Sequence, residues 1–499
     1  MSLRAATKSL ALLPALAAFA ICVSAARSAT LHVDDDAPGD PGPNNPAISD
    51  PLENGAADHP FDRIQEAVAA AANGDIILVA PGTYREHVNM LGKTISLRST
   101  DGPSVTVLDG NNSGTVLRCV SGEPRSTSIE GFTIRNGNDS GTASGVACSG
   151  SSPTIRGNVI VNNRGLGGAI SAFDNSDPLI ADNVIEDNNG AAGGGGLHCS
   201  DSAATVRGNR FSRNVSDLEV GGAIHAVRSR LVVTDNEFVE NLGLGGAALH
   251  VFDCPSVDVR RNRFIRNDGV SLFAGFQGAV TWYNSPGTLA DNLFFANRGD
   301  LGGAVFISDS SPLWRNNTIV ATRSSGAFQD PPVFASGAAS FFLRSSILWD
   351  NGPFNNIGGS AAANVQVVFC DVQGGASGTG NLDLDPRFVD QASGDLRLAA
   401  NSPCRDAGDP AFVPAADDGD VDNEPRLVGG RVDIGADEFV IRGDANLDGQ
   451  VTIIDIGPFV ETLLGQEVDP RIVHVCDVSK DGATDGGDVR PFLVALGAL

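Results

Sequence analysis

The chain has 499 residues, 60 acidic against 34 basic, a formal charge of −26 and a pI of about 4.5. So acidic a chain argues against nucleic acid as a partner, because phosphate backbones are bound by cationic surfaces. After the first 26 residues no stretch approaches the roughly 20 apolar residues of a membrane-spanning helix, so the sequence predicts no membrane span.

Residues 1–26 are typical of a secretory signal peptide. Arg4 and Lys8 precede an apolar stretch from Leu10 to Val23, and small residues follow at 24–26. We therefore expect a secreted protein, either extracellular or at the cell surface.

A short amphipathic helix is predicted over 61–72. Its apolar residues Ile64, Ala67, Val68 and Ala71 lie on one face, and Asn73-Gly74 ends it. Strands are expected at 75–79, 94–98 and 105–108. The helix should cover the N-terminal end of a strand stack, where open strand edges otherwise invite association.

The central part of the chain repeats with a period of about 25 to 30 residues. Two asparagine columns mark the period, and residues 131, 136, 346 and 351 are expected to extend them. The first column is Asn158, Asn183, Asn209, Asn236, Asn262, Asn292 and Asn317, and the second is Asn163, Asn188, Asn214, Asn241, Asn267 and Asn297. We expect these asparagines to form hydrogen-bonded turn ladders rather than to carry chemistry.

Apolar columns at fixed distances from the asparagines are predicted to point inward. They are Ile160, Ile185, Phe211, Phe238, Phe264, Phe294 and Ile319, and Ile155, Ile180, Val206, Val233, Val259 and Leu289. Short β-branched or aromatic strands separated by Asn and Gly turns favour a parallel β-helix solenoid over helical repeats. The Gly-Gly runs should turn the backbone sharply between sheets.

Seven cysteines remain after the signal peptide, so at least one should be a free, buried thiol in an oxidising compartment. Cys148 and Cys199 share a column two coils apart, about 10 Å, which is beyond the reach of a disulfide. Pairing of Cys119 with Cys148, or of Cys370 with Cys404, stays open.

Several segments near the N-terminus resemble secreted right-handed β-helix proteins of the pectin-lyase-like superfamily. They are Phe61–Val68 (FDRIQEAV), Gly74-Asp75, Pro81–Glu86 (PGTYRE) and Leu108–Gly110 (LDG). The resemblance implies a right-handed parallel β-helix over 31–383, with about ten to twelve coils. Pectin methylesterases of this superfamily carry a Gln-containing motif that 144–148 (SGVAC) lacks, so we do not expect esterase activity.

One face of the solenoid gathers residues that could do chemistry. His198, His225 and His250 occupy one outward column on successive coils, and three residues further on a second column holds Asp174, Asp201, Arg228 and Asp253. As a lyase, the protein would use Asp201 and Asp253 to hold calcium against an acidic sugar, with Arg228 as the base beside His225.

Three alternatives to the lyase hypothesis stay open. A hydrolase would use a carboxylate pair as acid and base. Without catalysis, the face would be stacked side chains that bind sugar through residues such as His198, His250 and Asp174. The imidazoles could also hold a transition metal, although a straight column converges poorly on one ion.

Residues 384–440 change pattern, and are similar to the terminal segment of many secreted bacterial β-helix proteins. We interpret them as a C-terminal cap of the solenoid and not as a second catalytic domain. Their many Asp residues are expected to form turns.

Residues 443–499 contain two copies of a calcium-loop pattern, 33 residues apart. Hard oxygen donors at alternating positions around a Gly turn are what a seven-coordinate cation needs. The side-chain ligands would be Asp444, Asn446, Asp448, Thr452 and Asp455 in the first loop, and Asp477, Ser479, Asp481, Asp485 and Asp488 in the second.

The duplication, the Asp at position 12 and one helix after each loop resemble a type I dockerin. The resemblance implies bound Ca²⁺, with the backbone carbonyls of Gln450 and Ala483 as further ligands, and a cohesin-like partner. Positions 10 and 11, which dockerins use to recognise that partner, hold Ile453-Ile454 and Gly486-Gly487 instead of hydroxyl pairs.

The sequence therefore predicts an all-β, right-handed parallel β-helix with an N-terminal cap helix and a small α-helical calcium-binding domain. The function favoured by the resemblance is binding or cleavage of an extracellular polysaccharide by a monomeric protein. The alternative is a non-catalytic adhesive or structural protein of the cell surface.

Overall fold

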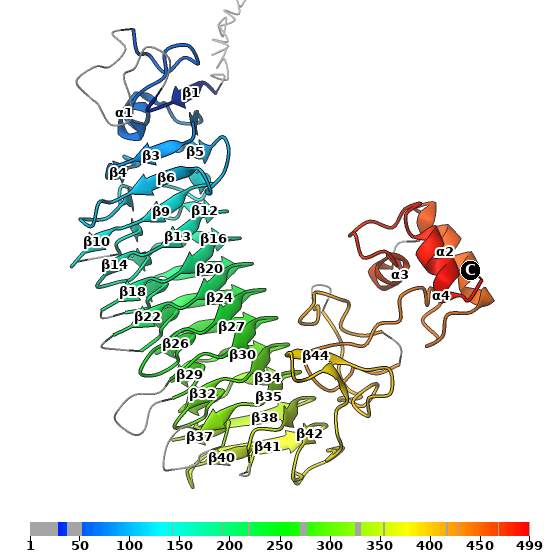
Figure 1. Cartoon of the computed structure of the whole chain (residues 1–499). Helices are drawn as coiled ribbons and strands as arrows, with labels where there is room; N and C mark the ends of the chain where they lie inside the picture. Colours follow the sequence, from blue (N-terminus) through cyan, green and yellow to red (C-terminus); the bar gives the residue numbers. More distant parts are fainter. Residues whose placement is uncertain are drawn as a thin grey trace, which may run out of the picture.

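The computed structural model describes residues 28–36, 52–141, 143–191, 193–217, 220–269, 277–324, 331–352, 355–415, 418–428, 430–467 and 469–498. The predicted signal peptide lies outside these residues. Most of the described chain forms a long stack of short parallel strands, with one helix at the N-terminal end and three helices in a separate C-terminal module (Figure 1).

Three long parallel sheets run the length of the stack, and each coil of the chain adds one strand to each of them. The 13-stranded sheet contains, in order, β1 (Thr30–Val33), β2 (Ile76–Val79), β5 (Ser96–Ser99), β8 (Ser128–Glu130), β12 (Thr154–Arg156), β16 (Leu179–Ala181), β20 (Ala203–Arg207), β24 (Arg230–Thr234), β27 (Ser256–Arg260), β30 (Gly287–Ala290), β34 (Leu313–Arg315), β38 (Ser340–Arg344) and β41 (Asn364–Val368).

The 12-stranded sheet follows it in each coil. It contains β3 (Gly82–Tyr84), β6 (Thr106–Asp109), β9 (Thr133–Arg135), β13 (Val159–Val161), β17 (Val184–Glu186), β21 (Arg210–Ser212), β25 (Glu237–Val239), β28 (Arg263–Ile265), β31 (Leu293–Phe295), β35 (Thr318–Val320), β39 (Ile347–Trp349) and β42 (Asp371–Val372).

The 11-stranded sheet completes each coil. It contains β4 (Val88–Asn89), β7 (Leu117–Cys119), β11 (Val146–Ser149), β15 (Ile170–Phe173), β19 (Leu197–Ser200), β23 (Ile224–Val227), β26 (Leu249–Phe252), β29 (Val280–Tyr283), β33 (Val305–Ser308), β37 (Val333–Ser336) and β40 (Ile357–Gly359).

Two-residue strands lie between the 12- and 11-stranded sheets in some coils. They are β10 (Asn138–Asp139), β14 (Arg164–Gly165), β18 (Asn189–Gly190) and β22 (Val215–Ser216), and separately β32 (Arg298–Gly299) with β36 (Arg323–Ser324). Sheets of 11 to 13 strands agree with the ten to twelve coils expected from the repeat.

The predicted inward columns are confirmed, since every residue of both columns is fully buried. Phe211, Phe238, Phe264 and Phe294 stack ring on ring, with centroids 5.1, 4.9 and 4.6 Å apart. Parallel in-register pairing forces this arrangement, because equivalent positions of successive coils lie one strand spacing apart. The core is therefore a continuous apolar column inside the three sheets.

Both asparagine ladders are also confirmed. Nδ2 of Asn158 donates to Oδ1 of Asn183 at 3.1 Å, and the backbone N–H of Asn158 donates to the same oxygen at 3.0 Å. The N-terminal extension was predicted one residue too early, because Phe132 and Gly137, not residues 131 and 136, donate to the first asparagine of each ladder. The prediction chose Gly131 and Asn136 because Gly and Asn are typical turn residues. In the structure these two residues adopt positive φ and stand just before the ladder positions.

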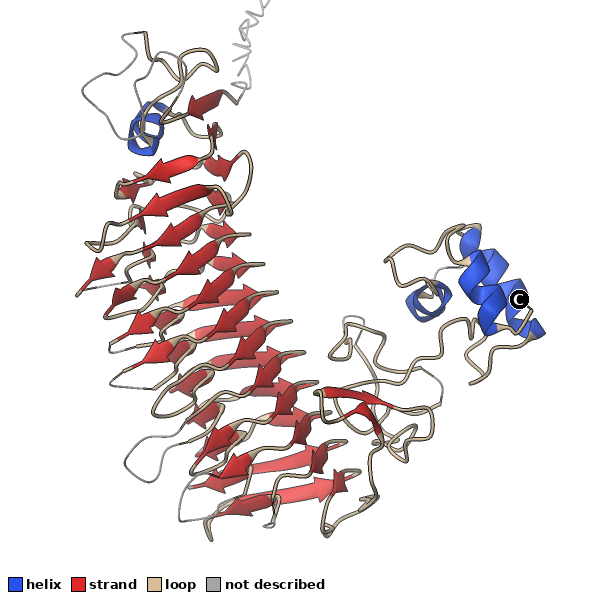
Figure 2. Ribbon diagram, in the orientation of Figure 1, coloured by secondary structure: helices blue, strands red, loops and turns tan. Residues whose placement is uncertain are grey.

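The predicted cap helix is α1 (Ile64–Ala70), which begins later and ends earlier than the sequence suggested. Ile64, Ala67 and Val68 are buried in the main core, and the helix packs on β1, β2 and β4. It therefore covers the first coil at one end of the stack (Figure 2).

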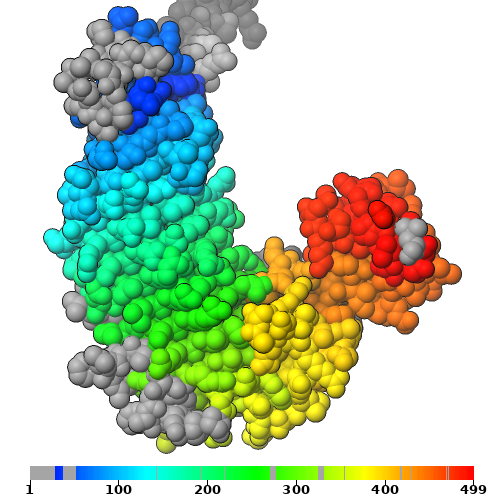
Figure 3. Space-filling model, viewed as in Figure 1, coloured from blue at the N-terminus to red at the C-terminus, as the bar shows by residue number. Residues whose placement is uncertain are grey.

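Residues 384–440 do not cap the end of the solenoid, as the sequence analysis proposed. They pack on its flank, where Leu396, Val421 and Ala436 cover Leu293 and Val320 on the outer side of the 12-stranded sheet. Figure 3 shows this segment, in yellow and orange, against the green coils. The outward residues of these coils are apolar, and so offer a surface that the segment buries.

The described residues of this segment have little regular structure beyond the antiparallel hairpin of β43 (Phe388–Asp390) and β44 (Asp395–Leu398). Buried carboxylates organise the rest by accepting backbone N–H groups. Asp420 accepts three of them, from Asp422, Glu424 and Glu438. The prediction that these aspartates form turns is confirmed.

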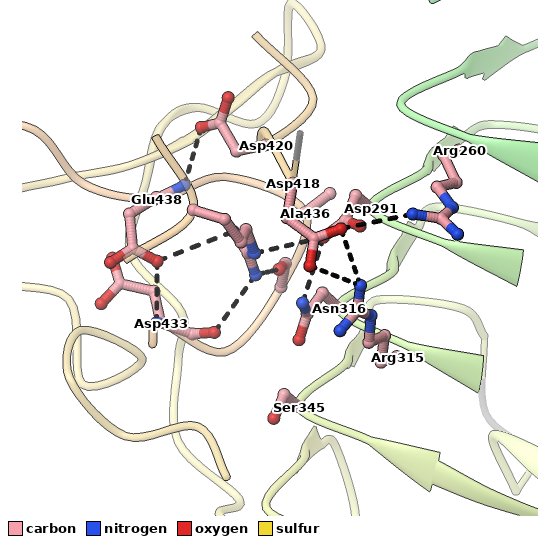
Figure 4. Close-up of polar contacts among 12 residues, drawn as sticks. Arg260, Asp291, Arg315, Asn316, Ser345, Asp418, Asp420, Asp433, Ala436 and Glu438 are labelled. Atoms are coloured by element: carbon pink, nitrogen blue, oxygen red, sulfur yellow. Dashed lines mark hydrogen bonds and ion pairs between the residues drawn. The ribbon is translucent and has the colours of Figure 1, made fainter. Parts of the chain in front are cut away.

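Ion pairs fasten the segment to the solenoid (Figure 4). Arg426, which is fully buried, pairs with Asp291 of the solenoid, Nε to Oδ1, at 3.1 Å. In a second pair the acid lies in the segment and the base in the solenoid: both carboxylate oxygens of Asp418 accept hydrogen bonds from Nη2 of Arg315, each at 2.9 Å. Such pairs specify one docking position, because a buried charge that lost its partner would be strongly destabilising.

All seven described cysteines are free and buried, and neither disulfide that the sequence left open forms. Cys119 and Cys148 lie opposite each other on neighbouring coils, whereas Cys404 donates to Asp371. Within the described residues, no helix is both long and apolar enough to span a membrane.

The C-terminal module contains the short 3-10 helix η1 (Ile453–Asp455) and the helices α2 (Ile456–Leu463), α3 (Pro470–Cys476) and α4 (Val489–Ala495). Helices α2 and α4 follow the two loops as predicted, and Phe459 stacks on Phe492 at 3.9 Å between centroids. Helix α3, before the second loop, was not predicted, because its seven residues give too short an apolar pattern.

Candidate functional site

The outer face of the 11-stranded sheet carries the predicted histidine column. Strand residues alternate between the two sides of a sheet, so in β19 Leu197 and Cys199 point into the core while His198 points outward. Register places His198, His225 and His250 side by side on β19, β23 and β26. The three imidazoles are outward, as predicted, but His225 and His250 are only 7% and 6% exposed.

The histidines belong to a longer row of rings that follows the solenoid axis. Ring centroids lie 5.1 Å apart between Phe173 and His198, 5.1 Å between His198 and His225, and 5.0 Å between His225 and His250. From His250 the row continues to Tyr283 at 5.8 Å. The aromatic row comprises Phe173, His198, His225, His250, Phe252, Tyr283, Phe306 and Phe334.

The sequence placed the histidines and Phe306 in one outward column but did not indicate Phe173, Phe252 or Tyr283. These three aromatic residues lie two residues after Ser171, His250 and Thr281, which pair in register along the histidine column, so strand alternation could have placed them on the same face.

Polar atoms in this row lack partners. In the part of the chain that the structure describes, Nδ1 of His225 and Nδ1 of His250 are buried without a hydrogen bond, as are the hydroxyls of Ser171 and Thr281 in the same column. Buried polar groups are nearly always hydrogen-bonded, so four orphans in one column require an explanation such as bound water or a ligand.

The imidazoles of the row are neutral. Burial lowers the pKa of His198 to about 4 and that of His250 to about 3. Burial, and then the neighbouring His250 and His198, lower the pKa of His225 to about 2. A neutral imidazole offers one N–H donor and one acceptor nitrogen.

The stacking geometry of His198 and His225 does not suit a shared metal ion. Their rings are nearly parallel, at 9°, with centroids 5.1 Å apart. Corresponding nitrogens then lie about 5 Å apart, whereas two nitrogens at about 2.1 Å from one zinc ion are at most about 4.2 Å apart.

The second column of candidate residues lies in exposed turns after the strands. Asp174, Asp201, Arg228 and Asp253 all adopt positive φ, between 47° and 56°. Each is tied to a neighbouring coil: Asp174 accepts from Ser149, and Asp253 accepts from Asn284 at 2.8 Å. Asp is common at such turns because it tolerates this backbone conformation.

Asp201 and Arg228 form a two-point ion pair, with Nε to Oδ1 and Nη2 to Oδ2 both at 2.6 Å. This pair raises the pKa of Arg228 and lowers that of Asp201. The structure thus brings Asp201 and Arg228 together and stacks the three histidines. It leaves the two groups apart, since three strand residues span about 10 Å.

The two loops of the C-terminal module fold alike. At position 1, Asp444 accepts from the backbone of Asp448 and Gly449, and Asp477 accepts from the equivalent residues of the second loop. At position 12, Asp455 accepts from Asn446 at 3.0 Å and from Thr452 at 2.7 Å. Asp488 repeats these contacts with Ser479 and Asp485.

The donor set of both loops fits Ca²⁺, because it consists of carboxylate, carboxamide and hydroxyl oxygens. Burial, opposed by backbone N–H bonds and reinforced by Asp455 and Asp448, raises the pKa of Asp444. In both loops the carboxylates hydrogen-bond to backbone N–H groups, and no three acidic residues have their oxygens within 4.8 Å of one another. Among the described residues, the one group of acidic residues that meets this spacing is Asp34, Asp35 and Asp36.

A family model described as right handed beta helix region matches residues 103–279. With the parallel sheets described above, this match establishes a right-handed β-helix domain. Among curated proteins, none matches the sequence.

Solved structures similar to this chain include several enzymes that act on polysaccharides. Pectate lyase Pel9A matches with a TM-score of 0.44 and 14% identity, covering 82% of this chain and 96% of that one. The PL6 family alginate lyase AlyGC matches with a TM-score of 0.36 and 13% identity, covering 65% and 53%. The catalytic domain of GH87 alpha-1,3-glucanase matches with a TM-score of 0.34 and 11% identity, covering 67% and 70%. At these identities the likeness concerns the fold.

Proposed function

We propose that this chain is a secreted protein that binds an extracellular polysaccharide on the outer face of the 11-stranded sheet. We further propose that its dockerin-like module, loaded with Ca²⁺, attaches it to a partner. One observation carries the first part: neutral imidazoles stack within a row of aromatic rings that follows the solenoid axis on that face.

The chemistry of the row suits a sugar. A sugar hydroxyl both donates and accepts hydrogen bonds, so it suits the neutral imidazole of His198, which is partly exposed, whereas His225 and His250 are buried. Aromatic rings offer apolar area to the C–H faces of the sugar ring, and Phe252 is 41% exposed beside Tyr283. Because the row follows the solenoid axis, it suits an extended polymer rather than a compact ligand.

The geometry favours binding over cleavage. Arg228 can act as a base only after losing its proton, and the ion pair with Asp201 raises the pKa of Arg228, so the guanidinium stays protonated and is not available as a base. The pKa of Asp201 is lowered, chiefly by the hydrogen bond from Arg228, so this carboxyl does not suit the role of general acid. Among the described residues, no carboxylate hydrogen-bonds to His198, His225 or His250, as a group that orients a catalytic imidazole would.

The calcium module supplies the attachment in this proposal. The ten side chains and two carbonyls predicted as ligands would hold two Ca²⁺ ions, which would neutralise the clustered carboxylates. Ile453 and Ile454 are 77% and 66% exposed, at the positions where a dockerin meets its partner. A cohesin-like protein with an apolar contact surface is the partner that they would fit.

Affinity electrophoresis on a panel of acidic and neutral glycans tests the proposal. We expect retarded migration on at least one glycan, without products. Ultraviolet absorbance of unsaturated ends would indicate lyase activity, and reducing ends without that absorbance would indicate hydrolysis; either result would replace binding by catalysis. Retardation by no glycan of the panel would refute polysaccharide binding and favour the adhesive or structural alternative.

A further inference from the structure

Three consecutive aspartates meet at the N-terminal end of the solenoid, far along the chain from the calcium loops. Asp34, Asp35 and Asp36 each offer a carboxylate oxygen, and these oxygens all lie within 4.8 Å of one another. Consecutive strand residues would point to opposite sides. The three converge because β1 ends at Val33 and the chain turns, with the N–H of Asp36 donating to Oδ1 of Asp34 at 3.3 Å.

Asp35 is the buried member of this group. It is 5% exposed, and its Oδ2 has no hydrogen-bond partner. Its carboxylate lies over Gly82 of β3: a Cβ at position 82 would stand 2.2 Å from Oδ1 of Asp35. A glycine at this position therefore leaves the space that the carboxylate occupies.

The negative charges of Asp35 and Asp36 are not balanced by a cationic side chain of the described residues. No ion pair of the described residues involves Asp35 or Asp36. An ionised carboxylate that is buried without a cationic partner, as Asp35 is, destabilises the folded protein. A cation bound beside Asp35 would remove this energetic cost.

We propose that Asp34, Asp35 and Asp36 bind one Ca²⁺ ion in the N-terminal cap. All donors are oxygens, which selects a hard cation. Two oxygens that share one Ca²⁺ at 2.3–2.6 Å can be up to about 5 Å apart, which includes the observed spacing. Three carboxylates suit Ca²⁺ better than Mg²⁺, which is usually held by one or two. The ion would hold the turn after β1 in the conformation that places Asp35 against Gly82 of β3.

Terbium luminescence can report this site alone. Tb³⁺ substitutes for Ca²⁺ and emits when a nearby Tyr or Trp transfers energy to it. Tyr84 lies two residues beyond Gly82 on β3, so its side chain starts about 7 Å from the glycine, on the same side. The chain has two Tyr and three Trp residues, and none lies in 443–499. Terbium bound in the calcium module therefore stays dark.

We expect Tb³⁺ to give sensitised emission with the full-length protein, and Ca²⁺ to suppress it by competition. Asp36→Asn removes one ligand at an exposed position, so the fold should be retained, and the variant should weaken Tb³⁺ binding at least tenfold. Asp35→Asn should abolish the emission. Tyr84→Phe should abolish the emission and leave Ca²⁺ binding, measured by equilibrium dialysis, unchanged.

Asp58→Asn is the matched control, because Asp58 is an exposed carboxylate of the same cap. This variant should behave as the wild type. Emission that is absent from the wild type, or that survives Asp35→Asn and Asp36→Asn undiminished, would overturn the proposal. The proposal stands on cap residues alone, so its failure would leave the polysaccharide and dockerin-like proposals untouched.

Discussion

Replacing Asn236 by Ala removes one rung from the first asparagine ladder. Nδ2 of Asn236 donates to the carbonyl oxygens of Val206 and Thr234, both at 2.9 Å, and to Oδ1 of Asn262 at 3.0 Å. Its Oδ1 accepts from the backbone N–H of Asn209 at 2.9 Å and from Nδ2 of Asn209 at 3.0 Å. The side chain thus joins three successive coils.

The size of the effect follows from which groups lose their partners. The backbone N–H of Asn209 is left unpaired in a buried turn, and the carbonyl of Val206 loses the amide donor. An orphaned buried group costs about 1–3 kcal/mol, so the free energy of unfolding should fall by about 3 kcal/mol. Asn236→Asp keeps the shape but turns a carboxylate toward two carbonyls, and should destabilise further.

Urea unfolding followed by circular dichroism measures the loss. Asn364→Ala is the control, because Asn364 is exposed in strand β41 with an ordinary backbone conformation, and its side chain donates only a long hydrogen bond, to Ser340 Oγ at 3.5 Å. That change should cost less than about 0.5 kcal/mol. Equal midpoints for the two alanine variants would show that the ladder does not stabilise the solenoid.

Three further predictions concern the core, the flank and the calcium module. Phe238→Asp should unfold several coils, since the charge cannot be solvated in the ring stack, while Glu237→Gln at the surface should leave the melting temperature within a few degrees; equal melting temperatures would refute the inward assignment. Burial, and then nearby carboxylates, raise the pKa of Asp437 to about 7, so the folded chain holds a proton that the unfolded chain releases near pH 4. Stability should accordingly fall as the pH rises from about 4 to about 7, and an unaltered slope in Asp437→Asn would contradict this. Asp444→Ala and Asp477→Ala should each remove one Ca²⁺ by calorimetry, and unchanged stoichiometry in both would refute the dockerin-like proposal.

Much of the fold could be predicted because the solenoid is built from local rules. The inward apolar residues and the turn asparagines can be recognised within a single coil, and parallel pairing repeats them at the same period in every coil. The flank position of 384–440 could not be predicted, since it depends on contacts such as Arg426 with Asp291, which join residues 135 positions apart. The aspartates of 384–440 indicate turns, but they do not indicate which distant part of the chain the segment packs on.

The candidate site was predicted in part for a similar reason. Alternation placed His198, His225 and His250 outward, but burial of the last two depends on how the neighbouring turns fold over them. Grouping these histidines with Asp201 and Arg228 was an inference from column spacing alone. The structure separates them because the strand ends between the two columns.

Binding of a polysaccharide by the aromatic row is the central claim, and one comparison tests it most directly. Phe252 lies in the row and Phe342 on the outer face of the 13-stranded sheet, and both are 41% exposed. With the glycan that the panel identifies, the dissociation constants of Phe252→Ala and Phe342→Ala should be measured by affinity electrophoresis. The loss of an aromatic anchor worth about 1.4 kcal/mol should weaken binding by Phe252→Ala about tenfold, while Phe342→Ala binds as the wild type. Wild-type affinity in Phe252→Ala, or the same loss in both variants, would contradict the account.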